Sequence, residues 1–146
     1  MVQLFIGWLQ GSMEYILDNQ RALRVGDARV QKIASLYRQL GYLVWINPSN
    51  HQGVDLIIIS TRDGRIKKVI EITNYSKKEY YVGNERFKRY MDSLTFYKDI
   101  EGIEMQLFIS YRENLSMNQY QILKKYGIIV NVVGKQDLPT NESKNP

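Results

Sequence analysis

Two acidic residues stand in neighbouring aliphatic stretches near the middle of the chain. Asp55 lies near the start of residues 54–60, and Glu71 lies near the end of residues 66–73. Both stretches have the composition of buried β-strands, and the intervening Arg62-Asp63-Gly64-Arg65 is typical of a turn. The sequence therefore predicts a β-hairpin that carries one carboxylate on each strand.

The register of this hairpin decides whether the two carboxylates meet. If the pairing is centred on Asp63, Asp55 lies directly opposite Glu71, with the Cβ atoms ~5 Å apart. A two-residue Asp63-Gly64 turn shifts the pairing by one residue, which places Asp55 opposite Ile72 and Glu71 on the other face. In the first register Thr73 shares the face of Glu71, because strand side chains alternate.

Two carboxylates this close repel each other unless a cation lies between them. Flanked by lysines and arginines, such a pair suits an Mg²⁺ site, or an Mn²⁺ site, that acts on phosphodiesters. The metal would polarise the scissile phosphate and help ionise an attacking water. The alternative is structural: both acids are strand-end residues that pair with Lys67, Lys68 or Arg65. The two residues alone leave both readings open.

The positive charge of the chain is concentrated around this hairpin. The protein has 20 Lys and Arg against 15 Asp and Glu, and residues 62–89 hold nine bases and four acids, which accounts for the whole net charge of +5. Tyrosines are interleaved with these bases, among them Tyr80 and Tyr81. Clustered bases with aromatic residues suit binding of a nucleic-acid backbone. An ordinary solvated surface is the alternative reading.

Composition excludes several classes of protein. The chain has 146 residues, is 44% hydrophobic and contains no cysteine, which excludes disulfides, thiolate catalysis and iron–sulfur clusters. No apolar run approaches the ~20 residues that span a bilayer. We therefore expect a soluble protein of the cytoplasm, in a prokaryote or in the host cell of a virus, with no membrane partner. We expect an N-terminal arm at residues 1–12, a single domain at 13–134 and a disordered tail at 135–146.

The rest of the pattern alternates between helices and strands. We expect an α/β domain with a mixed central sheet flanked by helices. The first helix should turn Val30, Ile33, Ala34, Tyr37 and Leu40 inward, and Ser116 should cap the last helix, which Gly127 ends. The predicted elements are helices at 27–40, 84–97 and 116–126 and strands at 42–46, 54–60, 66–73, 104–110 and 128–133.

These features together resemble the PD-(D/E)xK nuclease superfamily, and within it most closely the archaeal Holliday junction resolvases. The resemblance covers roughly residues 26–110. It is carried by Gly26-Asp27-Ala28 with the helix that follows, by the loop and strand Ser49 to Ile57, and by Glu71-Ile72-Thr73 with the Tyr81-Val82-Gly83 turn and the basic helix after it.

The resemblance implies a restriction-endonuclease-like αβββαβ core and hydrolysis of DNA at branched or four-way junctions by a homodimer. Carried over to this sequence, Asp55, Glu71 and the backbone carbonyl of Ile72 are the metal ligands. With the charge pattern, the resemblance assigns DNA contacts to Ser49, Lys67, Lys68, Lys77, Lys78, Tyr81, Arg86, Lys88 and Arg89.

Two positions depart from the family pattern. Thr73 replaces the catalytic lysine, and Val30 replaces a glutamate of the first helix that serves as a further metal ligand. Lys77 or Lys78 could return an ammonium group to the site, and Asp27 or Gln31 could return a ligand. Loss of one charge-stabilising donor costs ~10²–10³ in rate. We therefore expect a structure-selective endonuclease with Asp55, Glu71, Thr73 and Lys77 in its catalytic centre, the alternative being a weak or inactive DNA-binding descendant.

Overall fold

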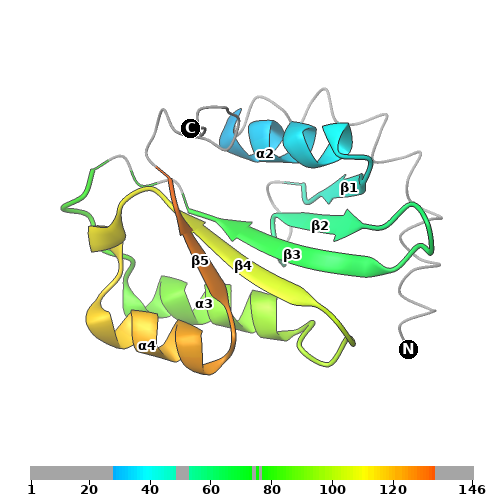
Figure 1. The fold of residues 1–146 in the computed structure, drawn as a ribbon. Helices are drawn as coiled ribbons and strands as arrows, with labels where there is room; N and C mark the ends of the chain where they lie inside the picture. Colours follow the sequence, from blue (N-terminus) through cyan, green and yellow to red (C-terminus); the bar gives the residue numbers. More distant parts are fainter. Residues whose placement is uncertain (1–27, 49–52, 74, 76, 134–146) are drawn as a thin grey trace.

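The computed structural model describes residues 28–48, 53–73, 75 and 77–133 (Figure 1). The predictions for residues 1–12 and 135–146, for Asp27 and for Ser49 lie outside these residues. None of the helices within them has the length and hydropathy needed to cross a membrane. The elements are α2 (Ala28–Gln39), β1 (Leu43–Ile46), β2 (Leu56–Ile59), β3 (Ile66–Ile72), α3 (Asn84–Thr95), β4 (Glu104–Ile109), the 3₁₀ turn η2 (Arg112–Asn114), α4 (Met117–Lys125) and β5 (Ile129–Val132).

The strands form one mixed sheet in the order β1-β2-β3-β4-β5. β1, β2 and β3 pair antiparallel, whereas β3, β4 and β5 pair parallel. Helix α2 covers one face of the sheet, and α3 and α4 cover the other (Figure 1). The predicted α/β class and mixed sheet are therefore confirmed, and α2-β1-β2-β3-α3-β4 has the expected αβββαβ order.

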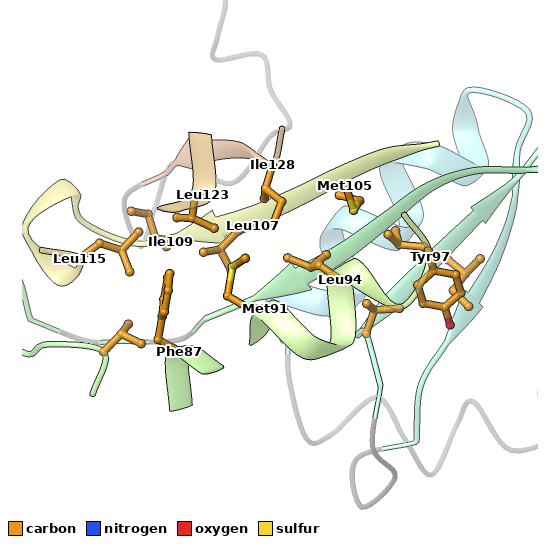
Figure 2. Packing of buried hydrophobic residues seen from close by; sticks show 14 of the residues in the cluster. Phe87, Met91, Leu94, Tyr97, Met105, Leu107, Ile109, Leu115, Leu123 and Ile128 are labelled. Atoms are coloured by element: carbon orange, nitrogen blue, oxygen red, sulfur yellow. The ribbon is translucent and has the colours of Figure 1, made fainter. Parts of the chain in front are cut away.

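Alternation along the strands divides the core into two layers. On one side Ile33 and Ala34 of α2 pack with Leu56 and Ile70. On the other side the apolar face of α3 packs on β4 and α4, as Figure 2 shows with Phe87, Met91, Leu94, Leu107, Ile109 and Leu123. All four residues of β2 are buried, as expected for a strand covered on both faces.

Local signals set the ends of the helices. The Ser116 hydroxyl accepts a hydrogen bond from the Gln119 backbone N–H, and the Gln119 side chain accepts from the Ser116 N–H, which caps α4 as predicted. Gly127 follows α4 with φ of 73°, a conformation that favours glycine. The prediction for Leu40 is wrong: α2 ends at Gln39, and Leu40 is 65% exposed in the turn that follows.

Candidate active site

The hairpin of β2 and β3 adopts the register centred on Asp63 over most of its length. Leu56 pairs with Ile70, and Ile58 pairs with Lys68, so the next pair along the strands is Asp55 and Glu71. The alternative prediction, in which a two-residue Asp63-Gly64 turn places Asp55 opposite Ile72, is therefore wrong. The register shifts between Ile58 and Ile59, near the turn, where β3 contains one residue more than β2. Beyond this β-bulge the pairing places Asp55 directly opposite Glu71.

Backbone hydrogen bonds fix Asp55 at the mouth of the hairpin. Its N–H donates to the carbonyl of Ile70 at 3.0 Å, and its carbonyl accepts from the N–H of Asn47, just after β1, at 2.9 Å. The Asn47 side chain also donates to the Val54 carbonyl at 3.0 Å. Asp55 is thus held from both neighbouring strands.

The two acidic side chains make direct contact. Asp55 Oδ2 accepts a hydrogen bond from the backbone N–H of Ile72 at 2.7 Å, and the Asp55 and Glu71 side chains are hydrogen-bonded to each other. The Ser93 hydroxyl, on α3, also hydrogen-bonds to Glu71. Glu71 is 6% exposed, whereas Asp55 is half-buried and closer to solvent.

Burial and the Asp55 charge together raise the pKa of Glu71 to about 10, against a smaller opposing effect of the Ser93 hydrogen bond. Glu71 is therefore protonated at neutral pH and donates to the Asp55 carboxylate. This proton removes the repulsion that two ionised carboxylates would have at this separation. A divalent cation could do the same in its place.

Two of the three basic residues that the structural alternative named, Lys67 and Lys68, form ion pairs with other acids. Lys67 Nζ lies 3.8 Å from Asp63, and Lys68 Nζ lies 2.9 Å from Glu104. Lys68 also lies over the Tyr37 ring of α2, on the face of the sheet opposite Ser93. The geometry does not bring Lys68 to the carboxylate pair, and its contact with DNA stays a prediction.

Thr73 is buried at the end of β3. It is 1% exposed, and its backbone N–H donates to the Phe108 carbonyl at 2.9 Å. Arg29, a buried residue of α2 that the sequence did not point to, donates from Nη1 to the Thr73 carbonyl at 2.7 Å. Within the described residues the Thr73 hydroxyl has no hydrogen-bond partner. The side chain at position 73 is therefore buried and uncharged.

A basic surface extends from the loop before α3 onto that helix. It consists of the exposed residues Lys77, Lys78, Tyr81, Arg86, Lys88 and Arg89. The Lys77 ammonium lies 5.8 Å from the centre of the Tyr80 ring, and Lys88 pairs with Asp92 at 2.9 Å. These positions suit contact with an extended polyanion, and the contact itself stays a prediction.

Two buried amides hold the loop that carries the basic surface. Asn114 Nδ2 donates to the carbonyls of Lys77 at 3.0 Å and Tyr80 at 2.8 Å, and the Asn114 carbonyl accepts from the Val82 N–H at 2.9 Å. Gln119 Nε2 donates to the Val82 carbonyl at 2.9 Å. Neither residue was a candidate from the sequence, because its contacts reach more than thirty residues back along the chain.

The donor atoms at the hairpin mouth fit a hard divalent cation. The Ile72 N–H points toward Asp55 and the Thr73 N–H toward β4, so the Ile72 carbonyl also points to the Asp55 side. The described part of the chain contains no group of three or more His, Asp or Glu side chains that could hold a metal. Two carboxylates and a carbonyl still suit Mg²⁺, which keeps several waters and binds substrate phosphates.

A surface pocket of about 290 Å³ lies at the other end of the hairpin. Its lining includes Leu40, Tyr42, Arg62 and Asp63, and Lys67 is the one candidate residue in it. The carboxylate pair is therefore separate from this pocket.

Comparisons with known proteins give one structural similarity. No family model matches the sequence, and no curated protein matches it. The fold is similar to the crystal structure of a repair endonuclease from Pyrococcus abyssi, with 16% sequence identity and a TM-score of 0.43. The matched region covers 80% of this chain and 46% of that one, so the chain spans less than half the length of that protein.

Proposed function

We propose that this protein is a metal-dependent endodeoxyribonuclease. The observation that carries the proposal is the direct contact of Asp55 and Glu71 on adjacent strands, in a protein whose net positive charge is concentrated in the same part of the sequence. Burial of two acids in contact is costly for folding. Such a pair is readily explained if its purpose is to bind a cation.

Asp55, Glu71 and the Ile72 carbonyl would hold Mg²⁺ or Mn²⁺. When bound, the metal would polarise the phosphodiester and lower the pKa of a water molecule bound to it. The side chains around the metal have separate roles. Glu71 must release its proton to become a ligand, and Ser93 donates a hydrogen bond to the ionised form. The basic surface holds the DNA backbone beside the carboxylates.

The substrate we propose is branched DNA, such as a four-way junction, cut by a homodimer. Support comes from the resemblance of residues 26–110 to Holliday junction resolvases. A two-fold dimer suits a substrate with two-fold symmetry, because each subunit can cut one strand of a symmetric pair.

The test is cleavage of a labelled four-way junction and of a linear duplex of the same sequence, with Mg²⁺, Mn²⁺ or EDTA. We expect metal-dependent cutting of the junction that is lost in Asp55→Asn and Glu71→Gln. Glu104→Gln is the matched control, because Glu104 is a carboxylate of the same sheet that is paired with Lys68 on the other face. Cutting by Glu71→Gln at the wild-type rate would refute the assignment.

A second candidate function is DNA binding without hydrolysis. The buried, uncharged Thr73 favours it, because a lysine at this position would stabilise the developing charge. Tight binding of the junction without cutting in either metal would support this function and refute the nuclease.

A further inference from the structure

The loop between β3 and α3 presents one tyrosine to solvent. Tyr81 is 71% exposed, although the next residue, Val82, is 3% exposed and belongs to the core cluster that includes Phe87 and Leu115. None of the ring or cation contacts formed by the described residues involves Tyr81. The Tyr81 ring is therefore accessible to a partner of the protein.

Asn114 holds the chain on both sides of Tyr81. This buried residue donates from Nδ2 to the Tyr80 carbonyl at 2.8 Å, and its own carbonyl accepts from the Val82 N–H at 2.9 Å. The two bonded groups belong to the peptide groups that flank Tyr81. The loop lies beside η2, which carries Asn114 (Figure 1). Because the backbone is already fixed where it displays the tyrosine, little backbone entropy is lost when the ring binds a partner.

The surroundings of Tyr81 suit a negatively charged partner. Residues 77–89 contain five lysines and arginines against two glutamates, and all seven side chains are exposed. Lys77 and Lys78 stand in the same loop as the tyrosine. A strand of DNA offers both matching groups, phosphates for the lysines and bases for the ring. An acidic peptide would match the charge but brings no flat aromatic group with each charge.

The pairing state of a base decides whether the ring can stack on it. In a duplex each base is stacked between its neighbours, so neither face is free for a side chain. An unpaired base exposes a face, and stacking on an aromatic side chain suits any base, since every base has such a face. Tyr80 is less suited to this role, because the Lys77 ammonium lies 5.8 Å from the centre of its ring.

We propose that Tyr81 stacks on an unpaired base of DNA, with Lys77 and Lys78 bound to the phosphates beside that base. The inference rests on the proposed function in one respect, the choice of DNA as the partner. It adds a preference, because DNA with unpaired bases should bind more tightly than intact duplex. Tyr81 is then a residue that determines specificity and takes no part in hydrolysis.

The experiment compares the Kd of two labelled DNAs in EDTA, an intact duplex and the same duplex with a short gap of unpaired thymines. Wild type should bind the gapped DNA about tenfold more tightly. Tyr81→Ala and Tyr81→Leu should lose this preference and bind the duplex as before, whereas Tyr81→Phe, which keeps the ring, should retain it. Tyr126→Ala is the matched control, because it removes a tyrosine that is exposed at the end of α4.

The lysines should act differently from the ring. Lys77→Gln and Lys78→Gln should each weaken the binding of both DNAs, and each should lower the slope of log Kd against log salt concentration by about 1. An unchanged slope in both variants would refute the phosphate contacts.

The outcomes separate this inference from the nuclease. Loss of the preference in Tyr81→Ala supports stacking even in a protein that does not cut DNA with Mg²⁺, a result that overturns only the nuclease. Equal weakening of both DNAs by Tyr81→Ala, or a preference that survives this change, overturns stacking. Loss in Tyr81→Phe as well, with a lowered midpoint of urea unfolding, assigns Tyr81 a structural role and overturns it too. Tighter binding of RNA with the same unpaired sequence overturns the choice of DNA, and absence of any DNA binding overturns both proposals.

Discussion

Replacement of Glu71 by glutamine tests the proton that joins the two acidic side chains. Glutamine has nearly the same shape, and its amide can donate to Asp55 and accept from Ser93, so the contacts of the protonated acid are kept. What the substitution removes is a group that must stay protonated in the folded protein. It should therefore change how stability depends on pH in metal-free solution.

The magnitude follows from the pKa of Glu71, which rises from 4.5 to about 10 on folding. Below pH 4.5 the side chain is protonated in both states. Above it the unfolded chain ionises while the folded protein keeps its proton, so unfolding becomes easier by about 1.4 kcal/mol per pH unit. Between pH 4.5 and pH 7 this amounts to about 3 kcal/mol. Glu71→Gln should thus be more stable than wild type by about 3 kcal/mol at pH 7, and equally stable near pH 4.5.

The assay is urea unfolding in EDTA at several pH values from 4.5 to 9, for wild type and Glu71→Gln. Glu104→Gln is a control of opposite sign, since the hydrogen bonds and charge of its partners lower the pKa of Glu104 despite some burial, and its removal should destabilise the protein at pH 7. The reasoning is refuted if the stability difference between wild type and Glu71→Gln is the same at pH 4.5 and at pH 8.

The remaining predictions concern the metal and the basic loop. Because Glu71 must lose its proton to bind a cation, the affinity for Mg²⁺ should rise about tenfold per pH unit between pH 6 and pH 8. Isothermal titration calorimetry in two buffers of different ionisation enthalpy should detect one proton released per bound Mg²⁺. An affinity that does not depend on pH would contradict this prediction. Asn114→Ala removes the donor to the Lys77 and Tyr80 carbonyls, so it should cost about 3 kcal/mol in urea unfolding and speed proteolysis near residue 80. Unchanged proteolysis would show that the loop does not depend on Asn114.

Much of the fold could be predicted because its signals are local. The alternation of apolar residues marked the strands, and Ser116 marked the start of α4. The hairpin was also predictable, but its register was not, because the bulge between Ile58 and Ile59 depends on how the turn fits the packed strands.

The candidate site was predicted only in part. Asp55 and Glu71 could be named because they stand at the same end of one hairpin. Ser93 and Arg29 could not, since each reaches the hairpin from a helix distant in sequence, and nothing in their local pattern sets them apart. Long-range contacts of this kind depend on how helices lie on the sheet.

The hydrogen bonds of Asn114 and Gln119 affect which substitutions the loop before α3 can accept. Both side-chain amides donate to backbone carbonyls, those of Lys77, Tyr80 and Val82, and every residue type has such a carbonyl. The shape of the loop is thus largely independent of which side chains it displays. Exposed residues such as Lys77 and Lys78 can be exchanged through mutation while the scaffold stays intact, so the charge that this loop presents can be altered without rebuilding the fold.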